Sequence, residues 1–184
     1  MSFSLSTNRL LLHVEDESIA DKVLEFYKDN QQFFDNVEPT RPNNFYTLAY
    51  QEAALKYEHS ETIKGHTIRY FVYRKENPDI IIGSVNFSKI QGSPFSCATI
   101  GYKFHHDYWG HGYATESCQA AIGMLFSNYR VHRIEGRVLT DNISSIHVLE
   151  RLGFTYEGRE YKSVEINGVF ADHFRYSLLN NDFH

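Results

Sequence analysis

The chain has 184 residues, of which 42% are hydrophobic and 22% charged, so it is long enough for one hydrophobic core and too short for two of ordinary size. Its formal charge of −5, from 18 Lys and Arg against 23 Asp and Glu, argues against a protein that grips nucleic acid through its phosphates. Two cysteines, Cys97 and Cys118, exclude a disulfide framework, and neither a signal peptide nor a membrane-spanning stretch is recognisable. We therefore expect one cytoplasmic domain over residues 1–184, with no nucleic-acid or membrane partner.

The first half of the sequence predicts a strand, two helices and an antiparallel meander. Leucines alternate over residues 9–14, which predicts a strand, and Asp16 is a suitable cap for a helix to about residue 28. The polar segment of residues 29–65 contains a second predicted helix, over residues 46–59. Alternating apolar residues then predict three strands and two turns: strands at residues 68–73, 80–88 and 97–104, with turns at residues 77–79 and 91–94.

The second half alternates helices with strands. An apolar stripe predicts a helix after the loop of residues 105–113, and a strand follows at residues 133–139. Asp141 or Asn142 caps a short helix that stops at Gly153. The last two predicted strands, residues 156–166 and 169–179, meet at the hairpin signal Asn167-Gly168. The order β, α, α, βββ, α, β, α, ββ predicts a mixed α/β sheet.

A glycine-rich loop between a strand and a helix is the most informative segment. Gly110 and Gly112 allow a sharp turn, and the N-terminus of the following helix adds a partial positive charge, so the loop suits a phosphate group. It is not a dinucleotide fingerprint, because Thr115 stands where the third glycine belongs, and it lacks the lysine of a P-loop. An ordinary tight turn is the alternative for this loop taken alone.

A second segment, one strand later along the chain, favours a binding role for this loop over an ordinary tight turn. Trp109, Gly112 and Ala114 match the pattern Gln/Arg-x-x-Gly-x-Gly/Ala, with Trp in the first position. The later stretch matches Asn-x-x-Ala/Ser followed by Gly-Phe through Asn142, Ser145, Gly153 and Phe154. Together these motifs resemble the acetyl-CoA-binding core of the GNAT superfamily of N-acetyltransferases. Further segments are similar to its ribosomal-protein-alanine N-acetyltransferase branch: residues 7–12, 100–102, 108–116, 132–135, 148–154 and 167–168.

The resemblance covers residues 7–179 and is weakest over residues 29–65, which we expect to be a variable helical segment for the substrate. It implies an α/β (α+β) fold with a mixed, mostly antiparallel central sheet, splayed at its middle and flanked by helices. It also implies acetyl-CoA as co-substrate. The backbone that would pair with the pantetheine arm belongs to Tyr102, Lys103 and Phe104. The groups that would bind the pyrophosphate are the Thr115 hydroxyl and the amides of Trp109, Gly110, His111, Gly112, Tyr113 and Ala114.

Two further residues gain roles from the resemblance. Asn142 would contact the cofactor from the neighbouring strand end, and Ser145 would lie near the thioester. Each also has a structural alternative, because Asn142 is a good helix N-cap and Ser145 can satisfy first-turn amides.

The catalytic groups of the family are not all in their usual places. Many members carry a tyrosine that protonates the leaving thiolate, and that position is Leu149 here, with Ser145 as a substitute. The position of a glutamate base in some ribosomal members corresponds to Val164. Glu165 is adjacent but points to the opposite face of a regular strand. The general base is therefore unassigned.

We expect an N-acetyltransferase that moves an acetyl group directly to a primary amine. A peptide α-amine, with a pKa near ~8, is partly neutral in the cell, whereas lysine at ~10.4 needs more help from a base. The missing base thus favours a protein N-terminus as acceptor, with a ribosomal protein suggested by the resemblance. The alternatives are a small amine (a polyamine, amino acid or aminoglycoside) and, in another class, a non-catalytic acyl-CoA-binding regulatory module. A homodimer is left open.

Other polar residues are candidates for metal, hydrolase or cation-binding sites. His105, His106 and His111 share a loop, but adjacent histidines are expected to point apart and no metal motif is present, so no metal is predicted. Ser145 and His147 do not indicate a hydrolase site, because Ser145 is not in the GxSxG nucleophile elbow of that class. Asp172 falls on an apolar strand face and is expected to be a hydrogen-bonded anchor. Four acidic residues of the helical segment attract a cation or are simply solvated: Asp35, Glu38, Glu52 and Glu58.

Overall fold

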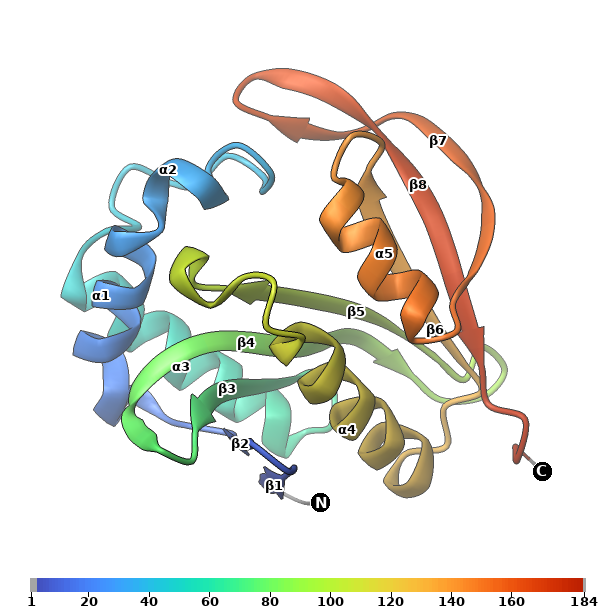
Figure 1. The fold of residues 1–184 in the computed structure, drawn as a ribbon, viewed down its shortest axis with the longest axis horizontal. Helices are drawn as coiled ribbons and strands as arrows, with labels where there is room; N and C mark the ends of the chain where they lie inside the picture. Colours follow the sequence, from blue (N-terminus) through green and yellow to red (C-terminus); the bar gives the residue numbers. More distant parts are fainter. Residues whose placement is uncertain (1–2, 184) are drawn as a thin grey trace.

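The computed structural model describes residues 3–183 and is built around one sheet of eight strands in the order β1-β2-β3-β4-β5-β6-β8-β7 (Figure 1). Every neighbouring pair is antiparallel except β5 and β6, which are parallel. The strands are β1 Ser4–Ser6, β2 Leu10–His13, β3 Ile68–Arg74, β4 Asn77–Gln91, β5 Cys97–Phe104, β6 Arg133–Leu139, β7 Thr155–Ile166 and β8 Val169–Leu179. The predicted mixed, mostly antiparallel sheet is confirmed.

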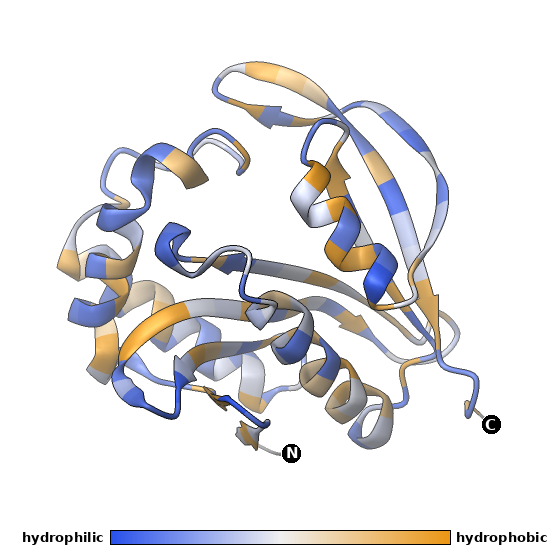
Figure 2. Ribbon diagram, in the orientation of Figure 1, coloured by the Kyte–Doolittle hydropathy of each residue, from blue (hydrophilic) through white to orange (hydrophobic). Residues whose placement is uncertain are grey.

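Helices cover both faces of this sheet and enclose two apolar cores. One face carries α1 Ala20–Asp29, α2 Gln31–Phe34 and α3 Leu48–Ile63, whose core includes Val23, Leu55 and Phe71. The other carries α4 Tyr113–Asn128 and α5 Ile143–Arg151. Figure 2 shows hydrophobic residues concentrated in the first part of β4, while the edge strand β7 is mostly hydrophilic. None of the described helices is long and apolar enough to cross a membrane.

The sheet opens in its middle, as the resemblance implies. β5 and β6 pair only from Cys97 opposite Arg133 to Ile100 opposite Gly136. Beyond that point residues 101–104 stay with β4 and residues 137–139 stay with β8, so the two halves diverge. Gly136 lets α5 pack at this point, because a Cβ there would lie 3.1 Å from a methyl group of Leu149.

Several predicted boundaries differ from the structure. The turn predicted at residues 77–79 is wrong: the hairpin closes at residues 75–76, where Arg74 pairs with Asn77, and Pro78 lies in the irregular start of β4. A proline is tolerated there because the bulge already interrupts the ladder. The helix predicted over residues 46–59 is α3, displaced towards the C-terminus, with Thr47 as its cap. Strand β1, which pairs with β2, was not predicted.

Candidate active site

A cleft of about 750 Å³ opens where β5 and β6 part. Its walls come from five places: the end of β5, the loop of residues 109–115, the end of β6, the start of α5, and the segment around Phe34 and Glu38. His173 of β8 completes the lining. The cleft therefore joins the two predicted motifs to the helical segment of residues 29–65.

The glycine loop (residues 109–115) presents the start of α4 to this cleft. Gly110 and Gly112 have φ of 77° and 78°, in the left-handed region that favours glycine. Gly112 is the N-cap of α4, and a glycine has no side chain to accept from the first-turn amides. The backbone amides of Tyr113, Ala114 and Thr115 are therefore able to donate to a ligand. The helix dipole makes this end of α4 favourable for an anion.

Side chains at both ends of the loop hold it in position. The Trp109 indole donates to the Phe104 carbonyl (2.8 Å), and His111 Nδ1 lies 2.8 Å from the Trp109 carbonyl. Arg9, from before β2, donates to the His111 carbonyl and pairs with Glu116 at 2.7 Å. Trp109 and His111 therefore contribute side chains that fix the loop itself.

The Glu116 carboxylate is the anchor that the sequence reasoning did not find. It accepts from the Thr7 hydroxyl at 2.6 Å and from the Arg9 amide at 2.9 Å. Burial raises the pKa of Glu116, but the hydrogen bonds from Thr7 and Arg9 outweigh it and hold the pKa below its usual value. The start of α4 is thus tied to the N-terminal strands by a charged group.

Ser145 and Tyr102 meet across the cleft. The Tyr102 hydroxyl lies 2.7 Å from Ser145 Oγ and 3.0 Å from the Ser145 carbonyl. Burial raises the pKa of Tyr102, so its phenol keeps its proton. Asn142 caps α5 by accepting from the Ser145 amide at 3.2 Å, as its structural alternative predicted. Leu149, in the position of the family's tyrosine, is buried.

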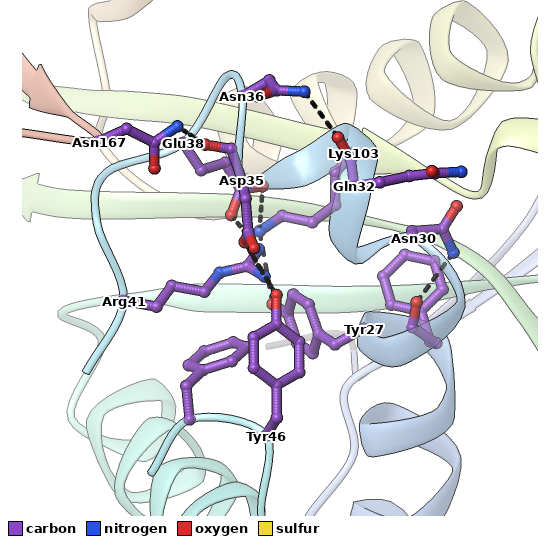
Figure 3. A network of polar contacts seen from close by, with 12 residues as sticks. Tyr27, Asn30, Gln32, Asp35, Asn36, Glu38, Arg41, Tyr46, Lys103 and Asn167 are labelled. Atoms are coloured by element: carbon purple, nitrogen blue, oxygen red, sulfur yellow. Dashed lines mark hydrogen bonds and ion pairs between the residues drawn. The ribbon is translucent and has the colours of Figure 1, made fainter. Parts of the chain in front are cut away.

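A network of charges occupies the other side of the cleft (Figure 3). Lys103 pairs with Glu38 at 2.6 Å, and Arg41 pairs with Glu38 at 2.7 Å and Asp35 at 3.1 Å. The Tyr46 hydroxyl also donates to Asp35, at 2.8 Å. Burial raises the pKa of Glu38, but Lys103 and Arg41 more than offset it, so the pKa is lowered. Solvation of Asp35 and Glu38, one of the two expected roles, is therefore wrong.

The hairpin of β7 and β8 bridges to this network. Asn167, at the predicted turn, donates from Nδ2 to the Asp35 carbonyl at 2.8 Å. The contact links residues 132 positions apart. Asn167 and Asp35 line a second, smaller cavity with Arg41 and Tyr46, so the hairpin joins the charge network beside the cleft. The sequence did not indicate this contact.

The remaining candidates have protein partners. The rings of His105 and His106 stack at 4.6 Å, so the expectation that they point apart is wrong; the loop turns within the 3₁₀ segment His106–Tyr108. With Asp107 they bring three possible ligand atoms within 4.8 Å of one another, but Asn30 Oδ1 already lies 3.0 Å from His106 Nδ1. Asp172 accepts from Arg159 and from the Lys162 amide (2.7 Å), which confirms a hydrogen-bonded anchor.

Comparison with known proteins agrees with this geometry. The family model described as "Acetyltransferase (GNAT) domain" matches residues 9–155, and the chain belongs to this family. It is an N-acetyltransferase and uses acetyl-CoA. The free amides at α4, the left-handed glycines and the size of the cleft fit such a ligand.

The chain resembles several individual members. It is 31% identical to "Probable N-acetyltransferase YjcK" of Bacillus subtilis (strain 168), over 89% of this chain and 90% of that protein. It is 26% identical to the [ribosomal protein uS5]-alanine N-acetyltransferase of Escherichia coli (strain K12), over 97% and 92%. The crystal structure of the ribosomal-protein-S5-alanine acetyltransferase from Vibrio fischeri superposes with a TM-score of 0.94 at 26% identity, covering 100% of both chains.

Proposed function

We propose that this enzyme acetylates the N-terminal amine of a protein, with a ribosomal protein as the acceptor. The observation that carries the proposal is the position Val164, which has no carboxylate: Val164 pairs with Ala171, and Glu165 pairs with Phe170 on the other face. An acceptor that gives up its proton readily suits a site without that carboxylate, whether water or a neighbouring neutral side chain takes the proton, and an α-amine does so more readily than lysine. Similarity to the uS5-alanine acetyltransferases over nearly the whole chain supports the same acceptor class.

Acetyl-CoA is expected to lie along the wall formed by β5, α4 and α5. Amides of the glycine loop, with the Thr115 hydroxyl, would hold the pyrophosphate. The backbone of Tyr102, Lys103 and Phe104, which has no strand partner on the β6 side, would pair with the pantetheine arm. Asn142 would contact the ligand from the end of β6. This places the thioester near Ser145.

Ser145 and Tyr102 offer a route for the proton that the thiolate needs. The amine nitrogen forms a bond to the thioester carbonyl carbon, the carbon–sulfur bond breaks, and sulfur takes a proton. Ser145 Oγ is positioned to give that proton and to recover one from the Tyr102 phenol, 2.7 Å away, or from water. This pair would replace the tyrosine missing at Leu149. We expect Ser145→Ala to lower kcat about tenfold, less than the ~100-fold or more of a typical general acid, because water can also protonate the thiolate.

Two assays test the proposal. Acetyl-CoA at ~100 times its dissociation constant should stabilise the fold by about 2.7 kcal/mol. Radiolabelled acetyl-CoA is then offered with peptides bearing a free N-terminus, with N-terminally blocked peptides that contain lysine, and with polyamines. Transfer to the free N-termini supports the proposal, and transfer confined to polyamines or lysine refutes it. Stabilisation without transfer to any amine would indicate the non-catalytic binding module.

A further inference from the structure

The acceptor side of the cleft, which residues 33–38, Lys103 and β8 line and residues 39–46 support, contains a histidine that the transfer step described above does not use. His173 lies on β8, opposite Leu139 at the end of β6, where the sheet opens. It lines the cleft, and only 6% of its surface is exposed. What this buried imidazole can do depends on the hydrogen-bond partners of its two ring nitrogens.

The position of His173 relates directly to the base that the sequence left unassigned. Val164, the position where the family pattern suggested a glutamate, pairs with Ala171. Residues directly opposite in an antiparallel pair share a face, and so do residues two apart on one strand. Val164, Ala171 and His173 therefore project from the same face of the hairpin. The His173 imidazole belongs to β8, the strand next to the one that carries Val164, and lies two residues beyond Ala171.

The contacts of the ring indicate which nitrogen carries the proton. His173 Nδ1 lies 3.3 Å from the Ala171 carbonyl and 3.2 Å from Ser163 Oγ. A carbonyl oxygen can only accept, so the arrangement in which both neighbours bond to the ring has the proton on Nδ1, shared between the Ala171 carbonyl and the Ser163 oxygen. In a neutral ring the lone pair is then on Nε2, which has no hydrogen-bond partner among residues 3–183.

The local fold keeps this ring in place. β7 bulges between Glu160 and Val164, and this irregularity brings Ser163 to Nδ1. Glu160, the cross-strand partner of His173, is engaged by Arg137 Nε at 2.9 Å, and Arg175 lies 3.7 Å from its other oxygen. The carboxylate opposite His173 is thus balanced by two guanidinium groups. Further along the same face of β6, β7 and β8, Arg133 pairs with Glu135 and Glu157.

From this geometry we infer that His173 is the general base of the reaction, accepting the proton of the acceptor amine on Nε2. The inference rests on the proposed transfer to an amine. The acceptor ammonium gives one proton to Nε2, and its nitrogen forms the bond to the acetyl carbon. The second proton leaves the nitrogen for water as the amide forms and the carbon–sulfur bond breaks. The thiolate takes a proton from the Ser145 hydroxyl, which recovers one from water, and His173 releases its own proton to solvent. The net release to solvent is one proton.

The kinetic test compares His173→Asn with Ser163→Ala, using whichever amine the wild type acetylates. The asparagine amide can keep the contact with the Ala171 carbonyl but cannot take a proton. We expect kcat/KM of His173→Asn to fall about 100-fold at pH 7. The deficit should shrink towards pH 9, because an α-amine with a pKa near ~8 then loses its proton unaided. Ser163→Ala, which keeps the imidazole, should lose less than about fivefold at any pH.

A second measurement does not depend on activity. Histidine-labelled protein without any ligand is examined by ¹⁵N NMR, and the His173 signals are identified by their absence in His173→Asn. The inference requires the tautomer protonated at Nδ1 near pH 8. Protonation at Nε2 would overturn it, and so would a kinetic deficit of equal size at every pH, which marks a structural role. A wild type that acetylates no amine would instead refute the proposed function, and the tautomer would still report on the ring.

Discussion

On the α4 side of the cleft, Gly112, Asn142 and Ser145 are placed by contacts within a few residues of the chain. Gly112 starts a helix, and Asn142 caps the next one by binding the amide three residues on. On the acceptor side, Glu38 is placed by Lys103 of β5, and Asp35 is bridged by Asn167 of the hairpin. The turn and the helix caps of one side thus follow from local sequence, although Arg9 and Glu116 tie that side to the N-terminal strands. The other side also requires Lys103 and Asn167 from distant strands.

The difference matters for function because the two sides are proposed to bind different ligands, acetyl-CoA on one and the acceptor on the other. A pyrophosphate and a pantetheine arm are constant, so a turn and a helix end that fold locally can serve many enzymes. An acceptor varies from one enzyme to another, and a wall made of separate segments can change by substitution in any of them. Four experiments follow from this contrast, arranged from the largest expected effect to the smallest.

Replacing Arg41 should destabilise the acceptor side while leaving acetyl-CoA binding intact. Only 9% of its side chain is exposed, and Arg41→Leu would leave Asp35 and Glu38 without their shared cation. We expect the free energy of unfolding, measured with urea, to fall by about 3 kcal/mol. Lys22→Met, which removes an exposed partner of Asp79, is the control and should change it by less than about 0.5 kcal/mol. A large loss of acetyl-CoA affinity in Arg41→Leu would show that the two sides are coupled.

Changing Gly112 to aspartate should weaken acetyl-CoA binding and leave the acceptor side intact. The left-handed backbone disfavours a side chain, and a carboxylate there repels a phosphate group. Titration calorimetry should show acetyl-CoA affinity reduced at least ~100-fold, or about 2.7 kcal/mol. Gly123→Asp carries the same charge further along α4, where the glycine has open space, and should bind normally. Equal binding by both variants would rule out the glycine loop as the phosphate site.

Glu38→Gln should alter how stability depends on pH. Because the fold lowers the pKa of Glu38 from a value near 4.5, its carboxylate stabilises the protein above that pH and loses this effect as the pH falls through the lower folded value. We expect the variant to be less stable by about 1.5 kcal/mol at pH 7, with a smaller difference below pH ~4. Chemical denaturation at a series of pH values measures it. A difference that grows in acid would contradict the ion pair with Lys103.

Breaking the contact between Asn167 and the Asp35 carbonyl should have the smallest effect. Asn167→Gly removes the contact with Asp35 and keeps the left-handed turn, since φ at this position is 51°. We expect the acceptor KM to rise about fivefold, which corresponds to about 1 kcal/mol, with kcat and acetyl-CoA affinity little changed. Val169→Ala, at an exposed position of the same hairpin, is the control. Steady-state kinetics measure these values, with the acceptor that the radiolabelled acetyl-CoA assay identifies. An unchanged KM would show that this contact plays no part in acceptor binding.

Caps, glycine stops and alternating apolar residues predicted well the elements of the wall along which acetyl-CoA is proposed to lie. The strand over residues 97–104 is β5 with the same bounds, and residues 133–139 are β6. Asn142 and Gly153 begin and end α5 as expected, because caps and left-handed stops act within a few residues. Glu116 could have been suspected, since a carboxylate in the first turn of a helix is favourable, but its partners Thr7 and Arg9 lie far back in the chain.

By itself the sequence determined the mixed sheet and the glycine loop, because glycine turns, helix caps and alternating strands depend on neighbouring residues. Its motifs pointed to the family, and that resemblance implied the splayed sheet. Only the tertiary structure decided the acceptor side. It set Lys103 against Glu38, brought Asn167 over Asp35, and turned His173 into the cleft beside the position of Val164. Such contacts depend on how strands pair and where a bulge falls, and a change in register would have placed a different side chain there.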